Sequence, residues 1–99
     1  MRPIHAARLE KLRPVVVLTR ELVRPYLERV TVAPIISTIQ GLSTEVLVGP
    51  PNGLDHRSVI SCDNIVTIPK GDLGRLIGHL LPAQEAALTA AIRAAFDLD

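Results

Sequence analysis

The chain has 99 residues, enough for one domain with its own core, and we expect residues 1–99 to form that single domain. Hydrophobic residues make up 47% of the chain but aromatic residues only 2%, which argues against a site that stacks bases on aromatic rings. The formal net charge of +1 excludes a strongly basic or acidic protein, and the lone Cys62 excludes an internal disulfide.

The basic side chains are concentrated in the first third of the chain. Residues 1–29 hold seven of the eleven Lys and Arg side chains against three Glu side chains, a local net charge of +4. Residues 30–99 hold four basic and seven acidic side chains, a local net charge of −3. This asymmetry favours a phosphate-facing edge opposite an acidic remainder, and arginines that are merely solvated are the alternative.

Sequence signals for export, membrane insertion and metal binding are missing. The N-terminus has no charged segment followed by an apolar one, and no apolar run approaches the ~20 residues of a membrane span. His5, His56 and His79 show no metal-ligand spacing, and Cys62 has no CxxC companion. We therefore expect a cytoplasmic protein that crosses no membrane and uses no metal or cofactor.

Short segments of β-branched residues separated by turn signals predict a small, mainly β core. The valine run 15–17 predicts a central strand that is buried on both faces, with Pro14 at its start. Pro34 predicts a bulge or a free edge in a second buried strand. The expected strands, in chain order, are 3–8, 13–19, 29–36, 44–48, 58–62 and 65–68.

The connections between these strands carry turn signals, and the C-terminal region changes to a helical pattern. We expect a tight turn at Glu10-Lys11, a helical turn within 21–27, a surface loop at 49–53 and a short helix at 70–73. Pro82 suits the first position of a helix. One amphipathic helix over 82–96 is predicted to pack on the sheet, with an apolar face made of Leu81, Leu88, Ala91, Ile92, Ala95 and Phe96.

Three sequence blocks within residues 13–80 match the pattern of a known family. The first block is Arg13-Pro14-Val15-Val16-Val17-Leu18-Thr19, and the second runs from Thr31-Val32-Ala33-Pro34-Ile35 to Gly41 and Thr44-Glu45-Val46. The third contains Gly53-Leu54, Ser58-Val59-Ile60-Ser61-Cys62-Asp63-Asn64, Thr67-Ile68-Pro69-Lys70 and residues 73–78. Together these blocks resemble the MazF/PemK family of toxin endoribonucleases, and the short segment 2–12 is similar to a branch with a clipped N-terminus.

The resemblance implies an α+β fold that is mainly β, a small SH3-like barrel of the PemK/CcdB type with a C-terminal amphipathic helix. It also implies the toxin of a toxin–antitoxin system, a sequence-specific mRNA interferase that cuts single-stranded RNA without a metal. In such a reaction the 2′-hydroxyl of the substrate attacks the adjacent phosphate. The implied partners are single-stranded RNA (mRNA, rRNA or tRNA), a second copy in a homodimer, and a MazE-like antitoxin whose acidic tail folds onto the basic groove.

Arg13 matches the catalytic arginine of the family, whose planar guanidinium suits two phosphate oxygens. The alternative for Arg13 is a structural ion pair with Asp63 or Glu45. Asp63 matches an acidic position that serves as general base in some members, whereas others use the position of Asn64. An Asx turn between two strands is the alternative explanation for Asp63-Asn64.

Ile36 stands where the family has a threonine beside the scissile phosphate. Isoleucine donates no hydrogen bond, and losing one transition-state donor commonly slows a reaction by about 10²–10³-fold. Thr38 shares the strand face of Ile36 but lies roughly 6.5 Å further along, and Ser37 points to the opposite face. We therefore predict a weakened active site. The expected RNA contacts are His5, Arg8, Lys11, Ser37, Arg57 and Asn64.

Other functions fit the same barrel. The chain would then bind RNA or an antitoxin without catalysis, or poison a topoisomerase as a structurally related toxin family does. Ile36 favours binding without cleavage, whereas Arg13 favours cleavage. Incubation with a long RNA in the presence of EDTA separates the readings, because a metal-independent nuclease still cuts.

Overall fold

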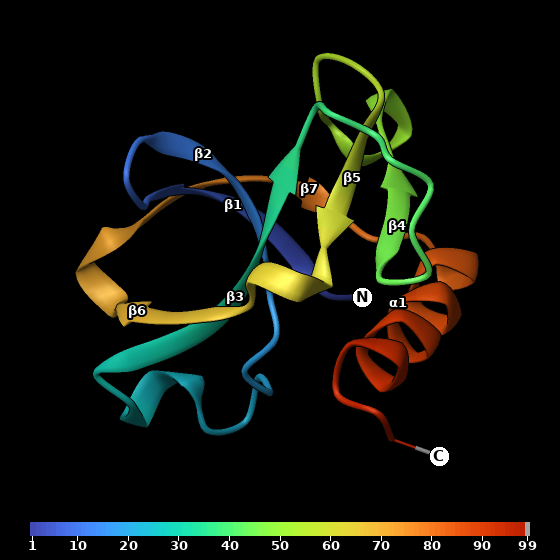
Figure 1. The fold of residues 1–99 in the computed structure, drawn as a ribbon. Coiled ribbons are helices and arrows are strands. Elements are labelled where there is room, and N and C mark those ends of the chain that lie inside the picture. The colour runs from blue at the N-terminus through green and yellow to red at the C-terminus, as the bar shows by residue number, and fades with distance from the viewer. Residues whose placement is uncertain (99) are drawn as a thin grey trace.

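The computed structural model describes residues 1–98, in which seven strands and one α-helix are connected by short 3₁₀ turns (Figure 1). The strands are β1 (Pro3–Arg8), β2 (Leu12–Val17), β3 (Arg29–Ile36), β4 (Glu45–Val48), β5 (Ser58–Ser61), β6 (Val66–Pro69) and β7 (Leu73–His79). Helix α1 spans Pro82–Ala95, and the 3₁₀ turns are η1 (Arg24–Tyr26), η2 (Pro50–Asn52), η3 (Cys62–Asn64) and η4 (Lys70–Asp72).

The strands form one antiparallel sheet in the order β4-β5-β3-β2-β1-β7, and β6 pairs with β3 beside β5. The sheet curls so that β6 and β7 come round to the same side of the molecule (Figure 1). Strand β2 lies between β1 and β3, and the three valines 15–17 are fully buried, as the sequence predicted. The predicted fold class, a mainly β barrel with a C-terminal helix, is confirmed.

Strand β3 changes its partner at Pro34. Residues Arg29–Val32 pair with β6, whereas Ile35 and Ile36 pair with β5, so neither strand pairs with Pro34 on that side. On the other side Pro34 lies opposite Val15 of β2. A proline lacks an N–H donor, which makes the gap between β6 and β5 a suitable place for it. Pro34 predicted a bulge or a free edge, and the structure has instead an interior break between two partner strands.

The two faces of the sheet cover two separate cores. On one face α1, β4 and β5 enclose the larger core, which includes Ile4, Val16, Ile60, Leu80 and Leu88. On the other face the curled strands close over a smaller core of Ala7, Val15, Val17, Val30, Val32 and Ile68. Because side chains alternate between the faces of a strand, neighbouring valines of β2 contribute to different cores.

Helix α1 contacts the sheet through a narrower face than the sequence predicted. Leu88 and Ala91 are buried, and Ile92 and Ala95 pack beside them. Leu81 and Phe96, expected on the same face, are exposed because they lie at the two ends of the helix. The helix begins at Pro82, as predicted, and none of the helices within residues 1–98 is long and apolar enough to cross a membrane.

Three segments differ from the sequence prediction. Residues 73–79 form β7, a strand that was not expected and that pairs with β1 through two register shifts. The expected surface loop at 49–53 contains the 3₁₀ turn η2, and Asn52 within it is only 2% exposed. Similarly, 70–72 forms a single 3₁₀ turn where a short helix was expected. These segments matter because β7 and η2 together position one wall of the candidate site.

Candidate active site

The turn between β1 and β2 presents Arg13 at the rim of the barrel. The Arg13 Nη2 donates a hydrogen bond of 2.7 Å to Oε1 of Glu10, three residues earlier in the turn. The Glu10 side chain is 71% exposed and the Arg13 side chain 19% exposed, so the ion pair lies at the surface. The Nε of Arg13 is buried and has no hydrogen-bond partner among the described residues.

The pairing of Arg13 with Asp63 or Glu45, which the sequence left open, is wrong. Oε1 of Glu45 accepts hydrogen bonds from three backbone N–H groups, those of residues 40, 41 and 42. Oδ2 of Asp63 accepts a hydrogen bond of 2.6 Å from Thr44 Oγ1. The Glu45 carboxylate therefore stabilises the loop before β4, and the Asp63 carboxylate links η3 to that loop. Arg13 is paired instead with the exposed carboxylate of Glu10 at the rim.

Arg13 lines two hollows, which we call the charged hollow and the apolar hollow. The charged hollow has a volume of about 370 Å³, and its polar lining residues are Lys11, Arg13, Ser37, Asp55, His56, Ser58 and Arg75. The apolar hollow has a volume of about 540 Å³ and is lined by Leu9, Glu10, Arg13, Pro34, Ile36, Asn64, Val66 and Ile68. The guanidinium group thus belongs to the wall between two spaces of different chemistry.

The residues that follow Pro34 are divided between these hollows. Ile36 lines the apolar hollow and Ser37 lines the charged hollow, as expected for neighbouring residues of a strand. Thr38 follows the end of β3, is exposed and lines neither hollow. The structure therefore brings Ile36 and Ser37, but not Thr38, to the two sides of Arg13.

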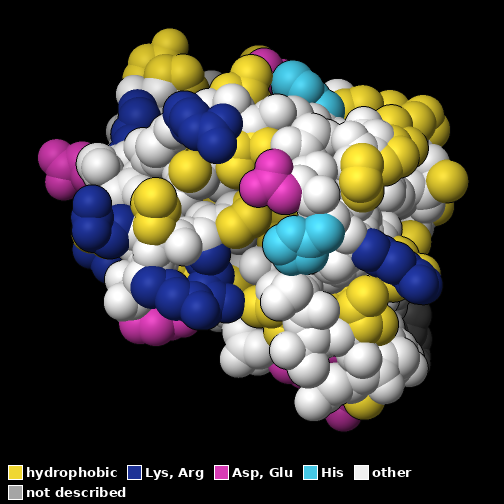
Figure 2. All heavy atoms as spheres, turned by 90° about the horizontal axis from the view of Figure 1, so that it is seen from above, with side chains coloured by type: hydrophobic (Ala, Val, Ile, Leu, Met, Phe, Trp, Pro, Cys, Tyr) yellow, Lys and Arg dark blue, Asp and Glu magenta, His cyan; other side chains and the backbone are white. Residues whose placement is uncertain are grey.

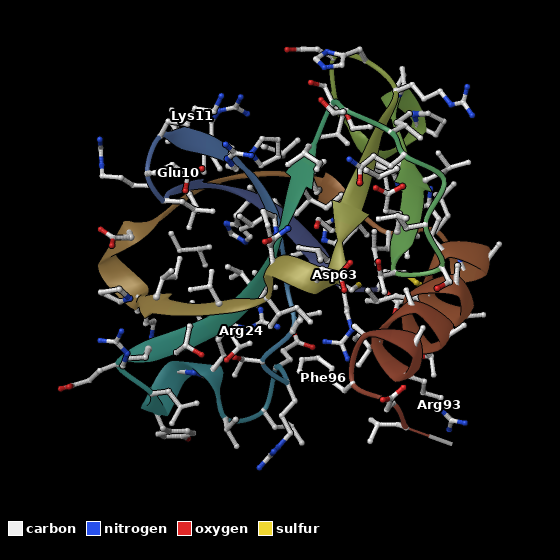
Figure 3. The ribbon with its side chains drawn as sticks, in the orientation of Figure 1. Glu10, Lys11, Arg24, Asp63, Arg93 and Phe96 are labelled. Atoms are coloured by element: carbon white, nitrogen blue, oxygen red, sulfur yellow. The ribbon has the colours of Figure 1, made fainter. Side chains whose placement is uncertain are left out.

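Asp63 and Asn64 are adjacent in η3 but lie in different surroundings. Asn64 lines the apolar hollow with Arg13, and its Nδ2 donates to Ser61 Oγ at 2.7 Å. Asp63 lies by the end of β5, apart from the turn that carries Glu10 and Lys11 (Figure 3). Asp63 instead acts on its neighbour: burial, together with the charge of Asp63, raises the pKa of the Cys62 thiol from 9.0 to about 11. Cys62 is 1% exposed and belongs to the larger core.

The other predicted RNA contacts are dispersed. Lys11 lines the charged hollow. His5 is hydrogen-bonded through Nδ1 to the carbonyl oxygen of Gly74 at 2.9 Å and lines a separate hollow with Arg2, Arg20 and Arg24. Arg8 is exposed at the end of β1, and the exposed Arg57 lines neither the charged nor the apolar hollow.

Four residues beside Arg13 were not among the candidates from the sequence: Glu10, Asp55, His56 and Arg75. Glu10 was assigned only to a turn, although a carboxylate three residues before the candidate catalytic arginine is a usable signal when a tight turn lies between them. Arg75 is on β7, which the sequence did not predict. No local pattern indicates that Asp55 and His56 lie opposite residues 11–13, because the fold alone brings these segments together.

Charge is distributed unevenly around this end of the molecule. Figure 2 shows Lys and Arg side chains gathered on the side of the β1–β2 turn, and an acidic side chain beside a histidine nearer the middle of the face. The charged hollow agrees with this view, since it combines three cations with one carboxylate and one imidazole. Within residues 1–98, no group of three or more His, Cys, Asp or Glu side chains is arranged to hold a metal ion.

The curled barrel with its C-terminal helix matches a family of toxins. A family model described as "PemK-like, MazF-like toxin of type II toxin-antitoxin system" matches residues 2–96, so this chain belongs to that family. It is 64% identical over 99 residues to the endoribonuclease MazF3 of Mycobacterium tuberculosis, covering all of this chain and 96% of the relative. The family predicted from the three sequence blocks is confirmed.

Two solved structures show how far the likeness of the fold extends. The M. tuberculosis toxin MazF-mt6 is 63% identical and superposes with a TM-score of 0.97 over 99% of each chain. An endoribonuclease in complex with its cognate antitoxin, from a mycobacterial species, is 22% identical with a TM-score of 0.87, over 98% of this chain and 93% of the other. At that identity the second likeness is one of fold.

Proposed function

We propose that this chain is a metal-independent endoribonuclease that cleaves single-stranded RNA at a short sequence. Family membership and the likeness to an endoribonuclease that is 64% identical support this function. The observation that carries it is the position of Arg13, which lines two hollows at the rim and has a surface carboxylate as its ion-pair partner. The guanidinium of Arg13 is therefore accessible to a phosphodiester.

In the proposed reaction the 2′-oxygen of the substrate attacks the adjacent phosphorus and the bond from phosphorus to the 5′-oxygen breaks. The products are a 2′,3′-cyclic phosphate and a free 5′-hydroxyl, which takes its proton from water. Arg13 binds the non-bridging oxygens and stabilises the charge that develops on them. No metal is needed for the nucleophile, because it is tethered beside its target.

The proton of the 2′-hydroxyl requires an acceptor, and two carboxylates are candidates. Glu10 is hydrogen-bonded to Arg13 and lines the apolar hollow, so a phosphate bound to Arg13 lies within its reach. Asp63, the candidate from the sequence, is hydrogen-bonded to Thr44 and lines neither hollow. We therefore assign the proton acceptor to Glu10. Cleavage rates of Glu10→Gln and Asp63→Asn distinguish the two, since only the true acceptor is expected to lose most of its activity.

A second function, RNA binding with little cleavage, is favoured by Ile36. This side chain lines the apolar hollow together with Arg13, where it donates no hydrogen bond to a phosphate. Arg13 would then still hold the phosphodiester, but a donor of the transition state would be missing. The balance between the two functions is measured by the ratio of RNA affinity to cleavage rate.

We also propose that the chain acts in the cytoplasm as a homodimer and that an antitoxin neutralises it. The mycobacterial endoribonuclease solved with its cognate antitoxin supports the antitoxin partner by analogy of fold. The local net charge of +4 in residues 1–29 suits an acidic antitoxin segment that competes with RNA. Light scattering of the free chain tests the dimer.

The proposed function is tested with purified protein, a long single-stranded RNA and EDTA. We expect fragments with 5′-hydroxyl ends from the unmodified chain and a loss of about 10²–10³-fold in rate for Arg13→Ala. Arg29→Ala is the matched control, because Arg29 is exposed and lines neither hollow. Binding without any fragments would support the second function, and an unchanged rate for Arg13→Ala would remove Arg13 from the mechanism.

A further inference from the structure

The charged hollow contains groups that the chemistry at Arg13 does not use. Asp55 and His56 lie on the loop between η2 and β5 and line this hollow together with Lys11 and Arg13. No side chain within residues 1–98 pairs with the Asp55 carboxylate, although three cations line the same hollow. An unpaired acceptor here repels phosphate but suits the donor edge of a base.

The loop that carries Asp55 and His56 is held rigidly at its start by Asn52. The Asn52 Oδ1 accepts from the Gly49 N–H at 3.0 Å, and Nδ2 donates to the His79 carbonyl at 3.0 Å and to Gln84 Oε1 at 2.6 Å. Gln84 Nε2 in turn donates to the Leu47 carbonyl at 3.1 Å. Helix α1, β4 and the end of β7 therefore all fix the start of the loop that carries Asp55 and His56.

Close backbone packing adds to this rigidity. Gly53 has a φ of +88°, and a side chain there would press on the carbonyl group of Ile77. A side chain at Gly78 would overlap the carbonyl group of Asn52. The loop and β7 thus contact each other directly, which fixes the width of the hollow between them.

The remaining walls of the charged hollow fit the other parts of a nucleotide. Leu12, Pro14, Leu54 and Ile77 provide apolar surface for the face of a base. Lys11 and Arg75 provide positive charge for its phosphates. The volume of about 370 Å³ falls within the range of about 300–1,000 Å³ that is usual for small-molecule sites.

We propose that the charged hollow reads one base next to the scissile phosphate, and that Asp55 accepts a hydrogen bond from the exocyclic amino group of cytosine. Uracil presents a carbonyl oxygen at the same position, which the carboxylate of Asp55 repels, so cytosine is preferred over uracil. His56 and the apolar wall pack against the base. This inference rests on the proposed function, since Arg13 holds the phosphate beside the base.

The test uses a randomised RNA pool, cut by the unmodified chain in EDTA, with the new 5′ ends sequenced. We expect one position near the cut where cytosine is preferred over uracil, and a fall of about tenfold in that preference for Asp55→Asn, because an amide both donates and accepts. Preferences at the other positions should be unchanged. Asp72→Asn, in η4 outside the charged hollow, is the matched control.

The outcomes separate this inference from the proposed function. If RNA is cut but no position distinguishes cytosine from uracil, or if Asp55→Asn leaves the pattern intact, the base-reading role is overturned and the nuclease stands. If no RNA is cut, the nuclease fails, and the affinities of the two proteins for oligo(C) and oligo(U) decide the role of Asp55. Equal affinities of the unmodified chain for both would then overturn it.

Discussion

The two hollows beside Arg13 are built in different ways. The apolar hollow is lined mainly by side chains of the barrel itself, such as Pro34, Ile36 and Ile68. The charged hollow is assembled from a turn, a long loop and the edge strand β7, which are distant in the sequence. One strand residue, Arg13, lines both hollows. Under the proposed function, cleavage and the reading of bases can therefore change separately.

The largest effect is expected in the apolar hollow. Ile36→Thr places a hydroxyl donor beside Arg13, and we expect the cleavage rate to rise by about 10²-fold. The preference for cytosine should not change, since Ile36 does not line the charged hollow. Single-turnover cleavage of one RNA measures the rate. Ile39→Thr, beyond the end of β3, is the control, and equal rates for Ile36→Thr and the unmodified chain would contradict the assignment.

A change to the loop anchor is expected to act on the charged hollow. Asn52→Ala removes the bonds to Gly49, His79 and Gln84, and unpaired buried groups cost about 1–3 kcal/mol in unfolding free energy. The KM for RNA should rise while kcat stays near its original value, because Arg13 is not displaced. Urea unfolding and steady-state kinetics measure the two effects. A fall in kcat alone would show that the two hollows are not independent.

The Cys62 thiol reports on η3, whose last residue Asn64 lines the apolar hollow. Its pKa of about 11, raised from 9.0, keeps the thiol protonated in the folded state. Between these two pH values the unfolded chain loses the thiol proton and the folded chain keeps it, so stability should fall as the pH rises from 9 to 11. Urea midpoints across this range measure the decline, and Cys62→Ser should abolish it.

In the folded protein the Cys62 thiol is buried and protonated, so it should react slowly with iodoacetamide at pH 8. In urea the thiol is exposed, and it should react rapidly. Mass spectrometry measures the modification. Rapid labelling of the folded protein would show that η3 opens, and the wall of the apolar hollow would then be less rigid than the loop of the charged hollow.

The smallest effect is expected from Lys11, an exposed residue at the rim of the charged hollow. Lys11→Gln should weaken RNA binding a few-fold and lower the slope of log Kd against log salt by about 1, without loss of stability. Binding titrations over a series of salt concentrations measure the slope. Lys70→Gln in η4 is the control, and an equal change in both variants would argue against a specific phosphate contact at Lys11.

Local patterns predicted most of the fold. The valine run 15–17 predicted a strand buried on both faces, and Pro82 with the 3.6-residue spacing of apolar residues up to 96 predicted α1. Strand β7 was missed because residues 73–79 contain two glycines and remain largely exposed, so they lack the usual strand signal. Their pairing with β1, about seventy residues earlier, is set by the tertiary structure.

The site was predicted in part. The first sequence block indicated Arg13, and strand alternation correctly separated Ile36 from Ser37. The partner of Arg13 was not found, since a local turn brings Glu10 to it while both expected carboxylates bind elsewhere. The charged hollow was not predictable, because it exists only where the β1–β2 turn, the loop at 53–57 and β7 meet.

The pairing of β1 with β7 also sets the order in which the molecule is completed. Strand β1 is synthesised first, yet one of its edges is covered only by β7, and the N–H of Leu80 then bonds to the carbonyl of Arg2. Such distant pairing slows folding and delays closure until nearly the whole chain has left the ribosome. Until residues 75 and 77 have been synthesised, a nascent chain has Arg13 but lacks two residues that line the charged hollow. Under the inference above, such a chain has no complete site to select its target base.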